Sequence, residues 1–420
     1  MRSLWRMRIG GYAPIEEYAA IGDGRTAALV ARDGSIDWLC LPNFDSPSVC
    51  AGILDAAHGG VFELQPTIPF DTSRRYLPHT NVLETHFTTG QGSVRVVDAL
   101  TLPNDHLDPM RELVRSVEGV AGAVPMRWRF VPRFNYGSEA PRCEWRQGIP
   151  IATWGSDAVG IASWDAGTPS WRDDVAEATF EIREGGRASL VLTAAYAEPL
   201  VFPGRAAVTA RLERTIRFWE QWSREREYQG PWADFVERSA LVLKLLIFAP
   251  SGASVAAPTT SLPEAIGGGR NWDYRFCWIR DATLTLYALL SSGYRGEARA
   301  WREWLLRAAA GHPSEMQIMY GIAGERRLTE WEVPWLPGYE GSCPVRIGNA
   351  AHQQLQLDVY GELLDALYAC HRYGLESSPF AWQLQKKLLE YVEKIWERPD
   401  CGIWEVRGEP RHFTFSKIMC

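Results

Sequence analysis

The sequence predicts a chain of two parts, an antiparallel β domain followed by a helical domain. Short stretches of alternating apolar and polar residues, separated by glycine turns, fill residues 12–205. Beyond residue 205 the apolar side chains instead recur at the spacing of one helical turn. The length of 420 residues fits two or three domains. We therefore expect a β domain at 1–204, a linker helix at 205–229 and a helical domain at 230–420.

Glycine turns mark the expected strands of the first domain. Asp33-Gly34 and the glycines at 90 and 92 stand between apolar runs and predict hairpins. Gly185-Gly186 predicts a further hairpin, between residues 179–183 and 189–193. Many short strands with regular turns indicate a sandwich or a barrel.

The second half of the chain shows helical segments separated by long polar loops. Pro231 stands at the favoured first-turn position of its first helix, and the apolar residues that follow form one stripe. Loops this long inside a compact domain are usually functional. Their alternation with helices is typical of paired helices arranged as a ring, with the loops gathered at one end. The expected helices cover about 282–291, 296–310, 351–373 and 381–397, with a last one from about 413.

Composition narrows the classes of function. A net charge of −7 argues against nucleic acids and anionic membranes, which require a basic surface. The eight cysteines are scattered without CxxC spacing, so neither a disulfide scaffold nor a zinc site is expected. No apolar run approaches the roughly 18 residues of a membrane span, and no signal-peptide core follows the basic N-terminus. We expect a cytoplasmic protein without a metal or cofactor.

One stretch, residues 271–281, concentrates side chains suited to holding a sugar. It reads NWDYRFCWIRD, with aromatic residues alternating along acids and arginines. Rings such as Tyr274 and Trp278 offer an apolar platform to the C–H faces of a pyranose. Arg280 beside Asp281 offers directed hydrogen bonds to hydroxyl groups. The alternative is an ordinary helix entry with core aromatics and a surface ion pair.

The best candidate for an acid catalyst is Glu405, in the loop sequence CGIWEVR. A carboxyl held against a tryptophan such as the neighbouring Trp404 keeps its proton to higher pH, as an acid catalyst must. Hydrolysis of a glycosidic bond needs such an acid and a second carboxylate. The alternative is that Glu405 is a surface residue opposing Arg407. The sequence lacks a serine nucleophile elbow, a Walker loop, a dinucleotide fingerprint and an HExxH motif.

A second cluster of acids and aromatics occupies residues 329–340, TEWEVPWLPGYE. It is expected either to form the wall of a sugar subsite or to be a loop held by its own aromatic residues. Arg346 and Asn349 follow it and are candidates to bind a ligand, although Asn349 also suits the N-cap of the next helix. We expect His352 to be structural. The substrate-binding candidates in and around this cluster are Trp331, Glu332, Trp335, Arg346 and Trp404.

These motifs resemble a known family. Residues 267–281, GGGRNWDYRFCWIRD, resemble the signature of the bacterial branch of glycoside hydrolase family 15, which holds glucoamylases, glucodextranases and some trehalases. The resemblance continues from about residue 12 to the last residue. The other segments that carry it are 18–40, 320–325, 337–351 and 402–417.

The resemblance implies an N-terminal antiparallel β-sandwich followed by an (α/α)6 barrel. It further implies an inverting, exo-acting α-glucoside hydrolase that releases β-glucose from an oligosaccharide or disaccharide. Glu405 matches the general acid. Trp278, Arg280 and Asp281 match residues that hold the terminal glucose, and Tyr274 matches the stacking aromatic.

The sequence departs from the family pattern at its C-terminal end. The family's general base lies on a later segment, and no residue matching it is present. About half of the twelve barrel helices are expected in these 420 residues, which suggests a C-terminally truncated chain with incomplete activity. A half ring exposes apolar helix faces, which favours pairing into a homo-oligomer. Two further readings remain open: a non-catalytic carbohydrate-binding remnant, and an inverting disaccharide phosphorylase of similar architecture.

Overall fold

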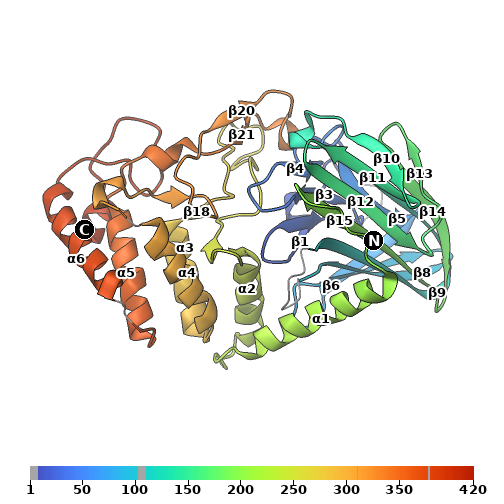
Figure 1. Cartoon of the computed structure of the whole chain (residues 1–420), viewed down its shortest axis with the longest axis horizontal. Helices are drawn as coiled ribbons and strands as arrows, with labels where there is room; N and C mark the ends of the chain where they lie inside the picture. The colour runs from blue at the N-terminus through green and yellow to red at the C-terminus, as the bar shows by residue number, and fades with distance from the viewer. Residues whose placement is uncertain (1–7, 103–109, 310, 377–378) are drawn as a thin grey trace. The chain divides into compact units, whose positions relative to one another are not determined.

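The computed structural model describes residues 8–102, 110–309, 311–376 and 379–420. It shows a β-rich N-terminal region followed by a helical region, as the sequence predicts (Figure 1). The chain divides into two compact units. The first comprises residues 1–224, 261–271 and 333–345, and the second comprises 225–260, 272–332 and 346–420. Two loop segments and the helix after residue 204 thus belong to the β-rich unit.

The sheet of the first unit is organised around one long strand, β9 (Arg111–Val131). Its N-terminal half pairs with β8 and β15, and its C-terminal half pairs with β5 and β14, all antiparallel. Two ladders of strands therefore share this strand. The other strands of the first unit are β1 (Ala19–Gly22), β2 (Ala27–Val30), β3 (Ile36–Cys40), β4 (Ser48–Cys50), β5 (Val61–Pro66), β6 (Phe70–Tyr76), β7 (Leu83–Thr89), β8 (Gly92–Leu100), β10 (Arg142–Arg146), β11 (Ile149–Trp154), β12 (Asp157–Trp164), β13 (Ser170–Arg172), β14 (Val175–Arg183) and β15 (Arg187–Tyr196).

Two of the three expected hairpins are confirmed and one is wrong. β2 pairs with β3 across Asp33-Gly34, and β7 pairs with β8 across the glycine turn at 90–92. The strands around Gly185-Gly186, β14 and β15, do not pair with each other along their lengths. Instead β14 pairs with residues 123–130 of β9, and β15 pairs with residues 111–118.

Backbone contacts at Gly119 explain this outcome. Gly119 donates its N–H to the carbonyl of Gly186 at 3.0 Å and accepts from the N–H of Gly185 at 2.9 Å. The turn therefore bonds to β9, and its two strands leave along different halves of that strand. A Cβ on Gly119 would lie 2.0 Å from the carbonyl oxygen of Arg183, so this crossing requires glycine.

The core of the first unit lies between the two ladders. Phe62 and Phe130 meet edge to face at 5.5 Å, next to the fully buried Trp128. One ion pair is buried with them: Arg115 donates to Asp98 at 2.8 Å, and its remaining N–H groups reach backbone carbonyls. A charge in this interior is tolerated because its hydrogen-bonding groups are paired.

The helices comprise α1 in the first unit and six in the described part of the second. α3 packs against α5, and α5 packs against α7. α2 contacts α3, α4 contacts both α3 and α5, and α6 contacts α5. α3, α5 and α7 therefore form a row of neighbouring helices. Their bounds are α1 (Arg205–Arg224), α2 (Ala233–Leu245), α3 (Ile279–Ser292), α4 (Arg295–Ala308), α5 (Asp358–Arg372), α6 (Pro379–Ile395) and α7 (Thr414–Met419).

The helix expected from residue 351 begins later, at Asp358. Residues 350–353 form a 3-10 turn, and the chain then runs extended before α5. The N–H of Leu357 is bound by the buried carboxylate of Asp400 at 2.9 Å, which satisfies a backbone donor at the start of α5. The interruption brings the residues before α5 close to the loop that carries Glu405.

Four strands of two residues each lie in the loops of the second unit: β16 (Ile247–Phe248), β17 (Ala253–Ser254), β18 (Cys277–Trp278) and β19 (Met319–Tyr320). The remaining short strands, β20 (Trp331–Val333) and β21 (Val345–Ile347), have three residues each.

Two bulk properties of the described residues bear on function. No helix among them is long and apolar enough to cross a membrane. All eight cysteines are described, and each is a free thiol.

Candidate active site

Trp278 and Arg280 are placed by a short strand that leads directly into a helix. β18 pairs with β19, and α3 begins at the residue after Trp278, which is 2% exposed. Arg280 and Asp281 therefore fall in the first turn of α3. The carboxylate of Asp281 is favoured there by the unpaired backbone N–H groups of the helix start.

Glu405 lies against these two side chains. The indole N–H of Trp278 donates to Glu405 Oε1 at 2.6 Å, and Arg280 Nη2 lies 3.9 Å from the same oxygen. Arg280 also donates to the carbonyl of Ile403 at 2.8 Å and pairs with Asp281 at 3.0 Å. One guanidinium thus joins the start of α3 to the loop that carries Glu405.

Burial raises the pKa of Glu405, whose side chain is 18% exposed. The hydrogen bond from Trp278 and the charges of Arg280 and Arg407 lower the pKa, whereas Asp281 raises it further. Because burial outweighs these favourable contacts, the carboxyl keeps its proton to higher pH than a solvated glutamate. A protonated carboxyl of this kind can donate to a departing oxygen.

The tryptophan that contacts Glu405 differs from the one the sequence suggested. Trp404 exposes 80% of its surface, so it does not shield its neighbour from water. Glu405 has a φ of 54° and forms a tight turn with Gly402, and adjacent side chains in such a turn point in different directions. The aromatic shield is supplied instead by Trp278, whose ring lies 5.6 Å from that of Tyr274.

The two arginine–aspartate pairs of residues 271–281 have different surroundings. Asp273 and Arg275 are both fully buried and bond through two N–H···O contacts, at 2.9 and 2.7 Å. Asp273 also accepts from the N–H of Gly348 at 3.1 Å, so this ion pair links two buried segments of the chain. The partly exposed pair of Arg280 and Asp281 is the one that lies beside Glu405.

A second cluster surrounds the ring of Trp272. The guanidinium of Arg346 lies 4.6 Å from the ring centroid, and that of Arg407 lies 4.5 Å from it. Glu330 accepts from Arg407 at 2.9 Å and lies 3.7 Å from Arg346. Glu332, predicted from the sequence, lies 3.4 Å from Arg346 at the exposed edge of the cluster. Residues from four loop segments thus converge here.

The remaining predicted residues lie in different places. Trp331 belongs to the second unit and is 39% exposed. Trp335 belongs to the first unit, where its indole N–H donates to the carbonyl of Tyr136 at 3.0 Å. A role for either in binding substrate stays a prediction.

Asn349 and His352 have structural contacts. Asn349 Oδ1 accepts from the N–H of Ala351 at 3.0 Å, which makes Asn349 the N-cap of the 3-10 turn. His352 is buried, and its Nδ1 lies 2.9 Å from the carbonyl of Asn349. Asn349 thus caps this turn and not α5, whose N-cap is Leu357, and ligand binding by Asn349 stays a prediction.

Three residues of the Trp272 cluster were not among the predicted site residues: Trp272, Glu330 and Arg407. Each stands within a motif that was selected for a neighbouring residue. Their proximity depends on loops that are distant in sequence, and the motifs themselves carried no signal of pairing. The sequence alone indicates Arg407 only as a surface partner of Glu405.

A pair of acids on α5 was also missed. Asp358 and Glu362 lie one helical turn apart and are both buried. Burial, together with the neighbouring Asp358, raises the pKa of Glu362 to about 7, while Arg280 opposes the shift. Among the described residues no group of three or more His, Cys, Asp or Glu is arranged to hold a metal ion.

Replacing Glu362 by Gln is expected to stabilise the protein at pH 8. The raised pKa means that the folded state holds this proton more tightly than the unfolded chain. Its contribution is complete below the unfolded value of 4.5 and is lost as the pH rises through about 7. Denaturation midpoints should therefore show a gain on the order of 1–3 kcal/mol at pH 8 and little gain at pH 4.5.

The exposed Glu390 on α6 provides a matched control for this prediction. Glu390→Gln should leave the unfolding free energy nearly unchanged at both pH values. A loss of stability at pH 8 in Glu362→Gln would contradict the assignment, because it would show that the ionised carboxylate makes a favourable contact.

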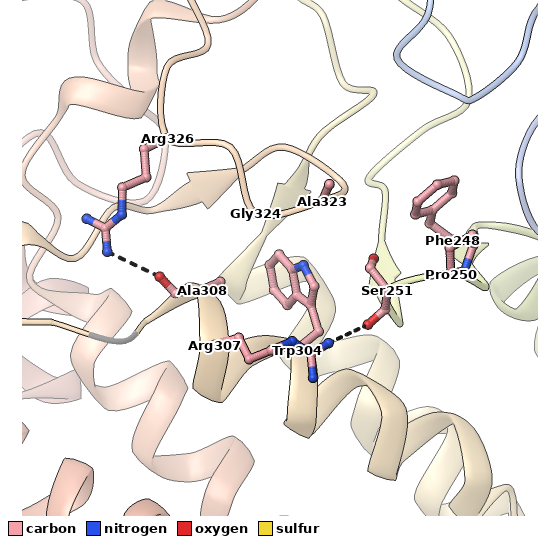
Figure 2. A pocket seen from close by; sticks show the side chains of 9 residues that line it. All are labelled: Phe248, Pro250, Ser251, Trp304, Arg307, Ala308, Ala323, Gly324 and Arg326. Atoms are coloured by element: carbon pink, nitrogen blue, oxygen red, sulfur yellow. Dashed lines mark hydrogen bonds between the residues drawn. The ribbon is translucent and has the colours of Figure 1, made fainter. Parts of the chain in front are cut away.

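A separate pocket of about 450 Å³ lies in the second unit (Figure 2). Trp304 and Arg307 of α4 form one side, and Arg307 donates to the carbonyl of Ser251 at 3.2 Å. Arg326 on another side donates to the carbonyl of Ala308 at 3.2 Å. None of the residues that line this pocket belongs to the Glu405 site or to the Trp272 cluster.

Comparison with known sequences identifies both parts of the chain. Residues 230–420 match the family described as glycosyl hydrolases family 15, and residues 2–157 match the one described as trehalase-like, N-terminal. A protein named trehalase from Mycolicibacterium smegmatis is 37% identical, over 97% of this chain and 65% of that protein. Trehalase 1 from Sulfolobus acidocaldarius is 36% identical, over 95% of this chain and 68% of that protein.

The chain spans slightly less than two thirds of the Mycolicibacterium trehalase, and slightly more than two thirds of the Sulfolobus one. A solved structure titled putative kojibiose phosphorylase, from the human microbiome, aligns with 84% of this chain and 53% of its own. Its TM-score of 0.41 and identity of 9% are too low to inform function. On the sequence matches, the chain belongs to glycosyl hydrolase family 15.

Proposed function

We propose that this chain provides the sugar-binding residues and the general acid of an α-glucoside hydrolase that acts on trehalose. The observation that carries the proposal is the environment of Glu405. Its carboxyl is largely buried, is bonded by Trp278 and has a raised pKa. Protonation of a glycosidic oxygen near neutral pH requires a carboxylic acid in this state.

The choice of trehalose is supported by the relatives and by the residues of the site. The relatives reported above are named trehalases, and the N-terminal match carries the same description. Beside Glu405, Arg280 and Asp281 are partly exposed and can bond the hydroxyls of one glucose unit. Tyr274, which packs on the buried Trp278, would bound that glucose on its apolar side. The exposed Trp404 would face the second glucose of the disaccharide.

The proposed reaction inverts the anomeric centre. Glu405 gives its proton to the bridging oxygen while a water attacks the opposite face of the departing ring. A second carboxylate about 6.5–9.5 Å from the acid activates that water in inverting enzymes. We assign none of the described residues to the role of this water-activating carboxylate. We further propose that the helices belong to an (α/α)6 barrel whose loops surround the substrate.

The products formed from trehalose distinguish the proposed reaction from its alternatives. We would express the protein from its native gene and follow the anomeric protons by NMR in phosphate buffer. Inverting hydrolysis first yields one β-glucose and one α-glucose for each trehalose. Glucose 1-phosphate would identify a phosphorylase, and two α-glucose molecules would identify a retaining hydrolase. Trehalose binding by calorimetry without any product would identify a carbohydrate-binding protein.

A further inference from the structure

The loop that carries Glu405 is held in place mainly by side chains. Between the bridge residues Asp400 and Arg411 it contains turns and bends, and neither a helix nor a strand ladder. Gln354 Nε2 donates to the carbonyls of Glu405 and Val406 at 3.3 and 3.4 Å. A catalytic carboxyl on such a loop needs further restraint, because a displacement of about 1 Å can reduce a rate about 100-fold.

Arg407 supplies this restraint through contacts with three other segments. It donates to Glu330 Oε2 at 2.9 Å and to Asn349 Oδ1 at 3.2 Å. Its guanidinium also lies 4.5 Å from the ring centroid of Trp272. Charge-assisted bonds are stronger than neutral ones, and the planar guanidinium can stack and bond at the same time.

The partners of Arg407 are themselves fixed. Glu330 Oε2 also accepts from the N–H of Ala350 at 2.9 Å. Asn349 is 1% exposed, and its Nδ2 donates to the carbonyl of Asp273 at 3.2 Å. Arg407 therefore binds to groups that are already oriented, so less conformational entropy is lost in forming these bonds.

We propose that Arg407 is a positioning residue that clamps the Glu405 loop onto Trp272, Glu330 and Asn349, so that the carboxyl of Glu405 meets Trp278. This inference rests on the proposed function for its catalytic consequence. Its structural consequence, an ordered loop, does not depend on that function.

The charge of Arg407 has a second effect, on the ionisation of Glu405. The groups that face this carboxyl are Trp278 and Arg280 at the start of α3, Asp281 beside them, and Arg407 on its own loop. Arg407 favours the carboxylate, so its removal should raise the pKa of Glu405. The alkaline limb of the pH–rate profile should then move to higher pH, because the acid form persists longer.

Three variants separate position from charge. Arg407→Gln removes both the clamp and the charge, whereas Arg407→Lys keeps the charge but loses the planar fork. Arg411→Gln makes the same change at an exposed arginine of the same loop. We would compare kcat, KM and the pH profile for trehalose. Hydrogen–deuterium exchange of residues 400–411 would report on loop order.

For Arg407→Gln we expect kcat to fall about tenfold to hundredfold, with KM changing by less than about threefold. The alkaline limb of its pH–rate profile should move to higher pH, and the amides of residues 400–411 should exchange faster. Arg407→Lys should restore the alkaline limb and part of kcat, and Arg411→Gln should match the wild type. If Arg407→Gln folds poorly, Glu330→Gln breaks the same ion pair and should also accelerate exchange.

Unchanged exchange and unchanged kcat in Arg407→Gln would overturn the proposal. A lower melting temperature with wild-type kcat and pH profile would also overturn it, since that is the result of a purely structural role. If the wild-type protein hydrolyses no α-glucoside, the proposed function fails by itself. The exchange comparison then still decides whether Arg407 holds the loop.

Discussion

Replacing Glu405 by Gln is expected to lower kcat for trehalose by roughly 10²–10⁴-fold, the contribution typical of a positioned general acid. Gln has the shape of the protonated carboxyl and can still accept the Trp278 N–H bond, which is 2.6 Å long in the native protein. It cannot release a proton to the bridging oxygen. Binding of trehalose, measured by calorimetry, should therefore stay within a few-fold of the wild type.

The control for this variant is Glu409→Gln, the same change at an exposed position of the same loop. It should retain the activity of the wild type. If Glu405→Gln were as active as Glu409→Gln, another group would have to protonate the leaving oxygen. The assignment of Glu405 would then be wrong even if the protein proved to be a trehalase.

The second large effect is expected at Arg280. This guanidinium bonds the carbonyl of Ile403, pairs with Asp281 and lies 3.9 Å from Glu405. Arg280→Gln should lower kcat/KM about 10²–10³-fold, since it removes a partly buried charge and several charge-assisted bonds. It should also move the alkaline limb of the pH–rate profile to higher pH, because the charge of Arg280 lowers the pKa of Glu405.

Arg280→Lys tests the geometry separately from the charge. A lysine ammonium cannot reproduce a planar fork that reaches three groups, so most of the activity should still be lost. The matched control is Arg295→Gln, which breaks an exposed pair with Glu227 at 3.7 Å on another helix start. Such surface pairs contribute little, so steady-state kinetics should not change. Equal activity in Arg280→Gln and Arg295→Gln would exclude Arg280 from the site.

The residues of the Glu405 site could be predicted because each stands in a compact local motif. Trp278, Arg280 and Asp281 lie within four residues of one another, and a strand-to-helix transition places them together. The raised pKa of Glu405 agrees with the expectation of a carboxyl held against a tryptophan. The residue that supplies the aromatic contact was assigned incorrectly. Sequence adjacency favoured Trp404, whereas the left-handed turn at Glu405 separates the two side chains.

The Trp272 cluster could not be predicted, because its members are close only in the folded chain. Glu330 and Arg407 are 77 positions apart, and their pairing depends on two loops that no local pattern relates. The misassigned hairpin has a similar cause. Gly185-Gly186 correctly indicated a chain reversal, but a glycine turn does not specify which strand the two flanking strands will pair with. Here the partner is the long β9.

The most direct test of Glu405 as the general acid compares two α-glucosyl substrates, one whose leaving group needs a proton and one whose leaving group does not. Trehalose must have its bridging oxygen protonated, whereas α-glucosyl fluoride releases fluoride without that help. We predict that Glu405→Gln loses roughly 10²–10⁴-fold in kcat on trehalose but stays within about tenfold of the wild type on the fluoride. Equal losses on both substrates would contradict the account, because Glu405 would then serve some role other than proton donation.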